Sequence, residues 1–436
     1  MTAEARVTKT PAETGLTEQF AATKVSLAGN TAVLARREKA FAVFEEKGLP
    51  HRRIEEWHYT DLRGKMRNAF AMAAGASGAD KSDLEQALAI DSYKVVIQNG
   101  LLVVGLSDLG ELEAGLTVRS LKASLEAGEE DVLNDDGLVD DAAVLLNSAF
   151  AQDGISISVA ENVTLSKPLQ ILHVSSEGET CSYPRHDLQV GNGANATIIE
   201  SFVGASEASY QVNTLSKVFV GDKAKVLWVK LQKEAADAQH ISSFAATVGA
   251  DSDFSHFTIT TGSSLSRNQI WIKCAGEGST IGCRGISMLN QKQHADVTLL
   301  VDHAVPSCDS REFYKSVVDD QSHSVFQGKI IVAPDSQKTD GQMMVQSLVL
   351  NDDAQVSVKP ELEIFADDVQ CAHGATTGDI DEDLLFYLRA RGIPEKQARH
   401  LLIIAFLAEV IEELDNEAVI EVLEAEVRSW LGTEEV

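Results

Sequence analysis

The chain is poor in cysteine, and the few thiols it has are scattered. Its 436 residues include five cysteines, with no C-x-x-C pair: Cys181, Cys274, Cys283, Cys308 and Cys371. An odd number of distant thiols argues against a disulfide framework and against a self-contained zinc or four-cysteine cluster site. Sparse, unpaired cysteines are typical of a reducing compartment.

Positive charge is also scarce. Lys and Arg total 37 against 66 Asp and Glu, which gives a net charge of −29. A field of this sign repels nucleic acid and anionic membrane, so we expect neither as a partner. It favours solubility and docking to basic protein surfaces.

Long apolar runs and targeting signals are missing. The longest apolar run, Leu401 to Leu407, is far shorter than the roughly 20 residues that span a bilayer. Residues 1–24 have no apolar core, and we predict a disordered tail there. We therefore expect a cytoplasmic protein.

Common catalytic and nucleotide-binding motifs are absent. There is no G-x-x-x-x-G-K-[ST] loop, no G-x-S-x-G and no H-E-x-x-H. Cys308 has no neighbouring base in sequence and is predicted to be structural. Asp302 with His303 is a weak acid/base candidate because no third partner is evident. The histidines of this region, His294 and His323 included, are too dispersed to define a metal site by spacing.

Residues 25–92 are predicted to form an N-terminal helical domain. Residues 32–47 carry apolar side chains at helical spacing, and Gly48 and Pro50 follow as a cap and a stop. Thr60 is predicted to cap a short helix. The aromatic and charged residues around Trp57 indicate a packed domain junction.

Residues 93–376 have a different pattern, with short runs of β-branched and aliphatic residues between Gly and Asn/Asp turns. Long helical patterns are nearly absent, which argues against alternating βαβ units. A β-sandwich and a parallel β-solenoid both fit. Turns spaced roughly 20–30 residues apart favour the solenoid. The predicted strands are 95–97, 196–199, 225–229, 257–259, 297–301, 329–332, 348–350 and 356–358.

Residues 377–436 are predicted to be helical. Asp381-Glu382-Asp383 puts negative charge at the start of one helix, and Gly392 and Pro394 separate it from the next. Apolar stripes continue to Leu431. These helices could cap the open end of a solenoid or form a docking surface.

One short stretch, Asp367 to Ala375, places Cys371 two residues before His373. In an extended strand both side chains point to the same face. Thiolate and imidazole are ligands for soft metals and iron–sulfur clusters, so the two residues are half of a candidate site. The competing interpretation of Cys371 is a small packed residue.

The same region carries a family resemblance. The stretches 348–354, 360–364, 367–376 and 385–393, with 56–62, 302–315 and 325–330, resemble the SufB/SufD family of iron–sulfur assembly scaffolds. The resemblance covers nearly the whole chain. The chain departs from SufB members, which have a sulfur-acceptor cysteine where Val345 stands and an acidic residue in place of Gly374.

The resemblance implies a mainly β fold, with a right-handed parallel β-helix between helical terminal domains. It implies a non-catalytic scaffold that pairs with SufB through the β-helix, and with the ATPase SufC through the C-terminal helices. His373 would be a ligand or iron-acquisition residue at the SufB interface, and Cys371 matches the motif cysteine. Iron or a transient cluster would be shared with SufB and absent from the isolated chain.

Two other functions remain open from the residues. A β-solenoid can carry a carbohydrate-active enzyme, which needs clustered carboxylates on one face. A purely structural homodimer is the second alternative, and an isolated chain of this family could also form one.

Overall fold

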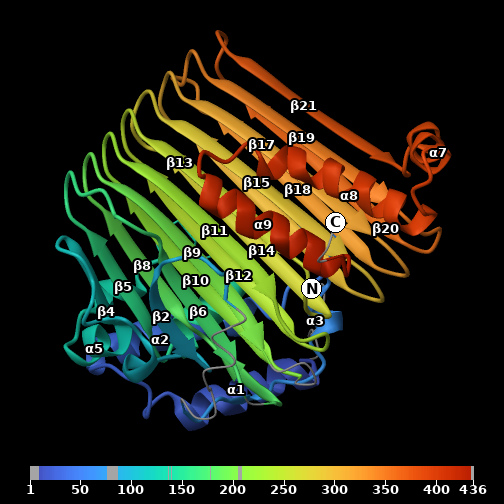
Figure 1. The fold of residues 1–436 in the computed structure, drawn as a ribbon. Helices are drawn as coiled ribbons and strands as arrows, with labels where there is room; N and C mark the ends of the chain where they lie inside the picture. Colours follow the sequence, from blue (N-terminus) through green and yellow to red (C-terminus); the bar gives the residue numbers. More distant parts are fainter. Residues whose placement is uncertain are drawn as a thin grey trace, which may run out of the picture.

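The computed structural model describes residues 9–75, 87–135, 137–138, 140–176, 178–204 and 209–433. Most strands run parallel in two facing sheets, and the chain alternates between the sheets as it coils along the stack (Figure 1). This is the parallel β-solenoid that the turn spacing favoured, and the β-sandwich alternative is excluded. Seven of the eight predicted strands lie within observed strands, and the eighth, 348–350, extends one residue beyond the end of β19 at Val349.

The first sheet follows the order β20, β18, β16, β14, β12, β10, β8, β5 and β4. In chain order these strands are β4 (Leu116–Ser120), β5 (Gly154–Val159), β8 (Arg185–Val190), β10 (Gln211–Val220), β12 (Gln239–Val248), β14 (Leu265–Cys274), β16 (His294–His303), β18 (His323–Val332) and β20 (Gln355–Ile364). The short strands β1 (Ala71–Met72) and β7 (Thr180–Ser182) join it beside β10.

The second sheet follows the order β21, β19, β17, β15, β13, β11, β9, β6, β2 and β3. Its strands are β2 (Tyr93–Gln98), β3 (Leu101–Leu102), β6 (Leu169–Ser175), β9 (Asn195–Gly204), β11 (Lys225–Lys233), β13 (Asp253–Thr260), β15 (Thr280–Leu289), β17 (Asp309–Val318), β19 (Asp340–Val349) and β21 (Gln370–Gly378). Within the described chain, only the β2–β3 and β4–β5 pairs are antiparallel.

Polar turns hold neighbouring coils in register. The Asn192 side chain accepts a hydrogen bond from the Asp222 backbone N–H, one coil later. The Asp222 carboxylate in turn accepts one from the Ala250 N–H. Lys223 and Asp251 adopt φ of 59° and 53° in these turns. The recurrence of Gly, Asn and Asp therefore reflects stacked turns rather than hairpins.

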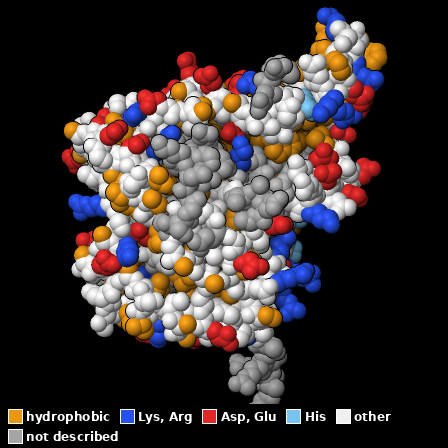
Figure 2. All heavy atoms as spheres, turned by 60° about the horizontal axis from the view of Figure 1, so that its bottom comes forward, with side chains coloured by type: hydrophobic (Ala, Val, Ile, Leu, Met, Phe, Trp, Pro, Cys, Tyr) orange, Lys and Arg blue, Asp and Glu red, His pale blue; other side chains and the backbone are white. Residues whose placement is uncertain are grey.

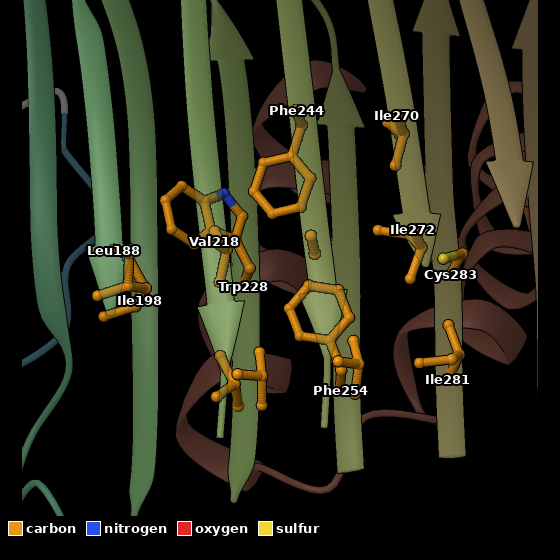
Figure 3. Close-up of a cluster of buried hydrophobic side chains, with 14 of the residues drawn as sticks. Leu188, Ile198, Val218, Trp228, Phe244, Phe254, Ile270, Ile272, Ile281 and Cys283 are labelled. Carbon is orange, nitrogen blue, oxygen red and sulfur yellow. The ribbon is translucent and has the colours of Figure 1, made fainter. Parts of the chain in front are cut away.

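An apolar core fills the space between the two sheets. Figure 3 shows Trp228, Phe244 and Phe254 packed between strands of opposite sheets, with Ile270 and Ile272 further along the stack. Alternation along each strand sends every second side chain into this core. The interior is thus a packed column, and the outer face of each sheet is left for helices.

The helices cover the outer faces. They are α1 (Pro11–Thr23), α2 (Thr31–Lys47), α3 (Leu62–Lys65), α5 (Leu121–Glu126), α6 (Ala142–Phe150), α7 (Glu382–Ala390), α8 (Glu395–Ile411) and α9 (Glu417–Trp430), with 3-10 turns at Glu55–Trp57, Val104–Leu106 and Glu130–Leu133. The N-terminal helices pack with α6 near Ile241 and Leu265 of the first sheet. Helices α8 and α9 lie across the second sheet (Figure 1).

The predicted tail of residues 1–24 is wrong where the structure describes it. Pro11–Thr23 is a helix that begins with a Thr10–Glu13 capping box. Its Leu16 and Phe20 are buried against α2 and α6. Burial of this apolar face gives the segment a fixed place. Residues 1–8 lie outside the described residues.

One smaller prediction also needs correction. Asp61, and not Thr60, caps α3, because Thr60 is buried against His294 and Asp296. The short helices α5 and α6 lie in the region 93–376, where long helical patterns were predicted to be nearly absent. Pro394 separates α7 from α8, as predicted, and stands at the N-cap of α8.

The C-terminal helices do not close the end of the stack. Helix α8 packs beside Phe257, Ile286 and Val317 on the flank of the solenoid. The last coil, β20 and β21, keeps mostly exposed or half-buried residues. No described helix is long and apolar enough to cross a membrane. Figure 2 shows acidic, basic and apolar side chains intermixed on one face of the molecule.

Candidate metal half-site on the last coil

Cys371 and His373 lie on β21, the last strand of the second sheet. β21 pairs in parallel with β19, so that Cys371 stands beside Gly341 and His373 beside Met343. Met343 is buried in the interior core, and Cys371 packs against that core. Both candidate ligands therefore occupy inward-facing positions at the end of the column.

The two side chains differ in exposure. Cys371 is half-buried, and burial raises the pKa of its thiol. His373 is exposed. In the described chain β21 pairs only with β19, so its other edge presents unpaired backbone groups. A second strand from outside would cover both residues.

The pair lacks further ligands. Among the described residues, no group of three or more His, Cys, Asp or Glu side chains with converging ligand atoms includes Cys371 or His373. A tetrahedral thiolate–imidazole site needs about four ligands. Cys371 and His373 therefore supply two of the about four ligands that such a site would need.

A buried carboxyl group lies below the half-site in the same column. Register places Cys283, Glu312, Met343 and His373 side by side on successive strands. Within the part of the chain that the structure describes, neither oxygen of the buried Glu312 side chain has a hydrogen-bond partner of normal geometry. Burial raises the pKa of Glu312 to about 8, so the group is mostly protonated at neutral pH.

The fold assembles a cluster that the sequence did not suggest. Cys274, His303 and Cys308 converge with their ligand atoms within 4.8 Å of one another, and all three are buried. Cys308, which has no neighbouring base in the sequence and was predicted to be structural, therefore has His303 beside it in the fold. A hydrogen bond from the Cys274 thiol lowers the pKa of Cys308 to about 4, although burial acts in the opposite direction.

The weak Asp302–His303 acid/base candidate is wrong. Consecutive strand residues point to opposite faces. His303 is fully buried and bonds Ser310 Oγ through Nε2 at 2.9 Å, whereas Asp302 lines a surface hollow with Lys273. The two side chains therefore do not act on one substrate.

A second buried cluster lies nearer the N-terminal end of the stack. His173, His186 and Glu200 converge within 4.8 Å. Burial lowers the pKa of His186 to about 3, so its ring is neutral. Lys230 Nζ lies 2.7 Å from His240 Nε2, and burial lowers the pKa of Lys230 to about 7. This network is enclosed and links neighbouring coils.

Such clusters can be recognised in the sequence as ligand-type residues that lie one coil length apart. Cys274 and His303 pair across β14 and β16, about 30 residues apart in sequence. In a parallel solenoid, residues one coil apart become neighbours. Cys371 and His373 are two residues apart and stand out in the sequence, whereas Cys274, His303 and Cys308 are spread over two coils and meet only in the fold.

Comparison with known proteins agrees with this architecture. The protein-family model described as "SUF system FeS cluster assembly, SufBD core domain" matches residues 173–406. A second family model, "SufBD protein N-terminal region", matches residues 12–171. The chain belongs to the SufBD family. The N-terminal match begins inside α1, as expected if that helix belongs to the folded domain.

Comparison with individual relatives places this SufBD chain more closely within its family. It is 34% identical to the iron-sulfur cluster assembly protein SufD of Escherichia coli, over 85% of this chain and 86% of that protein. It is 29% identical to a SufBD family protein of Synechocystis, over 89% of each chain. Protein ABCI7 of Arabidopsis thaliana chloroplasts is 33% identical over 62% of this chain and 59% of that protein. The chain is thus SufD-like over most of its length.

Proposed function

We propose that this chain is a non-catalytic scaffold subunit for iron–sulfur cluster assembly, which works in a complex with SufB and the ATPase SufC. The observation that carries the proposal is the incomplete Cys371–His373 pair on β21, the last strand of a SufD-like chain, which pairs with β19 along one edge and leaves its other edge open among the described residues. A half-site at an open edge suits a cargo held between two proteins. Iron or a nascent cluster is that cargo.

The last coil suits pairing with SufB. Its edge offers unpaired backbone groups of β21, and large apolar side chains are exposed on and beside it: Met344, Ile364 and Phe365. Backbone addition gives affinity, and apolar contacts exclude water around the ligands. SufB would supply the remaining ligands to iron beside His373, and Cys371 would contribute a thiolate once the metal displaces its proton.

Helix α7 suits docking of SufC. Leu384, Phe386 and Tyr387 are 51%, 73% and 54% exposed on this short helix, which packs with Leu385 toward the α8 and α9 cluster and lies at the edge of the molecule in Figure 1. Exposed clustered aromatic residues are typical of interaction sites. ATP hydrolysis would then take place in SufC, which fits the absence of a phosphate-binding loop from this sequence.

The ligand role is tested with His373→Ala in the complex co-expressed with SufB and SufC. We expect unchanged assembly and a several-fold lower iron and sulfide content after anaerobic reconstitution, because one ligand of the shared site is lost. His58→Ala removes an exposed imidazole outside β21 and is the matched control. Normal loading of the His373→Ala complex would contradict the proposal.

The docking role is tested with Phe386→Ser. We expect the variant to fold normally and to lose co-purification with SufC, because its exposed ring is then missing from the contact. Phe219→Ser removes another exposed ring, 48% exposed, from the flank of the solenoid and should leave SufC bound. Equal retention of SufC by both variants would show that α7 is not the docking site.

A further inference from the structure

The Cys274–His303–Cys308 cluster lies at a corner of the solenoid. Cys274 and His303 end adjacent strands β14 and β16 of the first sheet, and Cys308 directly precedes β17 of the second sheet. The turns 275–279 and 304–308 connect the sheets there. Two successive coils thus bring three soft ligands together at one buried point.

The distances suit coordination of a single ion. Cys274 Sγ lies 3.9 Å from His303 Nδ1, and all three ligand atoms lie within 4.8 Å of one another. A tetrahedral zinc ion with ordinary Zn–S and Zn–N bonds separates sulfur from nitrogen by about 3.6 Å. Movements of a few tenths of an ångström would bring Cys274 Sγ and His303 Nδ1 to that separation.

The hydrogen bonds already orient the imidazole. His303 Nε2 lies 2.9 Å from Ser310 Oγ, and donation from Nε2 leaves the lone pair on Nδ1, which faces the sulfur. Metal-binding histidines usually donate their other N–H in this way. Ser279 Oγ also donates to Cys308 Sγ at 3.2 Å and fixes that side chain.

Charge selects the class of ion. Two thiolates and a neutral imidazole carry two negative charges, which a divalent cation neutralises. A buried site with no net charge avoids the large cost of an uncompensated ion. Thiolate ligands favour zinc and iron over magnesium or calcium.

We propose that Cys274, His303 and Cys308 bind one divalent thiophilic ion, Zn²⁺ or Fe²⁺, with a fourth position open to water or an exogenous ligand. Binding releases the protons that the Cys274 and Cys308 thiols still hold to solvent, and no oxidation state changes. This site goes beyond the proposed scaffold function and does not depend on SufB.

The new site is separate from the half-site on β21. Ser310 is followed across the sheet by Gly341 and then Cys371. Strands lie about 4.8 Å apart, so the Cα atoms of Ser310 and Cys371 are about 10 Å apart. Variants can therefore address each site alone.

The test uses the full chain, purified with reduced thiols, stripped with a chelator and titrated anaerobically with Co²⁺ as a spectroscopic probe. We expect one tight equivalent with a thiolate-to-cobalt charge-transfer band. Cys308→Ser should weaken binding at least about 100-fold, and Ser310→Ala about 10–100-fold through loss of orientation. Cys283→Ser, a buried thiol outside the cluster, is the matched control.

A double variant, Cys371→Ser with His373→Ala, should keep the cobalt band. Loss of the band in that variant, or its absence from the wild type, would overturn the new site and leave the scaffold proposal standing. Normal cluster loading of the SufB and SufC complex that carries this double variant, together with an intact cobalt band, would instead overturn the scaffold proposal and leave the new site standing. X-ray absorption of the zinc-loaded wild type should show two sulfur ligands and one imidazole, whether or not the variants fold. Disappearance of two thiols on mild oxidation with no metal ever bound would identify a disulfide pair and contradict the proposal.

Discussion

At the scale of single residues, Glu312 is unusual because it buries a carboxyl group that has no hydrogen-bond partner of normal geometry among the described residues. Burial raises its pKa to about 8, above the ordinary value of 4.5 for a glutamate. At a pH between these two pKa values, the Glu312 carboxyl group keeps its proton in the folded protein and releases it in the unfolded chain. The free energy of unfolding therefore falls as pH rises through this range, relative to a group that cannot ionise.

Replacement of Glu312 by Gln tests this coupling. We expect Glu312→Gln to gain stability relative to the wild type as pH rises from 5 to 8, by up to about 1.4 kcal/mol for each pH unit. Urea unfolding at several pH values measures the difference. The exposed substitution Glu111→Gln should show no such trend. A constant difference between Glu312→Gln and the wild type would show that the carboxyl is already ionised in the folded state.

The residues of the two candidate sites differ in how far the sequence can predict them. Cys371 and His373 are two positions apart on one strand, so local geometry alone places them on a common face. Cys274, His303 and Cys308 meet only because two coils stack in a particular register. A shift of one residue would turn His303 outward, and composition cannot fix such a register.

At the scale of elements, α1 shows how a local signal can be overlooked. Thr10 and Glu13 form a capping box, and Ala12, Leu16 and Phe20 repeat every four residues on one buried face. The small and charged residues between them made residues 1–24 resemble a tail. By contrast, α6 is buried on all sides and has no polar face to reveal its period.

Phe20→Ala measures the contribution of α1. The ring stacks on Phe41 with centroids 4.1 Å apart and meets Phe150 edge-on at 5.5 Å. We expect the substitution to lower the free energy of unfolding by about 3–5 kcal/mol, the range for loss of a buried aromatic side chain. The exposed Glu18→Ala on the same helix is the control. Equal stability of Phe20→Ala and Glu18→Ala would show that α1 is only loosely attached to the rest of the protein.

At the scale of the whole molecule, the solenoid was predictable and the placement of its helices was not. Turn spacing separates a solenoid from a sandwich because each coil needs a similar length of chain. The apolar stripes of α8 and α9 predict burial without naming the partner surface. They cover the flank of the second sheet and leave the last coil open.

The exposed last coil, β20 and β21, is the expected surface for association with another protein chain. Ile364 and Phe365 are 39% and 62% exposed at the end of β20. We expect Ile364→Glu with Phe365→Glu to abolish pairing with SufB, and any dimer of the isolated chain, because charge opposes burial of this edge. Light scattering after size-exclusion chromatography measures both. Phe219→Glu is the control, and persistence of both complexes in the double variant would place the contact elsewhere.

Among the described residues, each strand from β11 to β19 pairs only with the strand one coil before it and the strand one coil after it. A duplication or deletion of one whole coil, about 30 residues, would therefore leave the packing of the other coils intact. It would move β21 along the stack axis by one strand spacing, about 4.8 Å, relative to α8 and α9. The distance between the last coil and helices α8 and α9 can therefore change only in whole steps of one strand spacing, and never continuously.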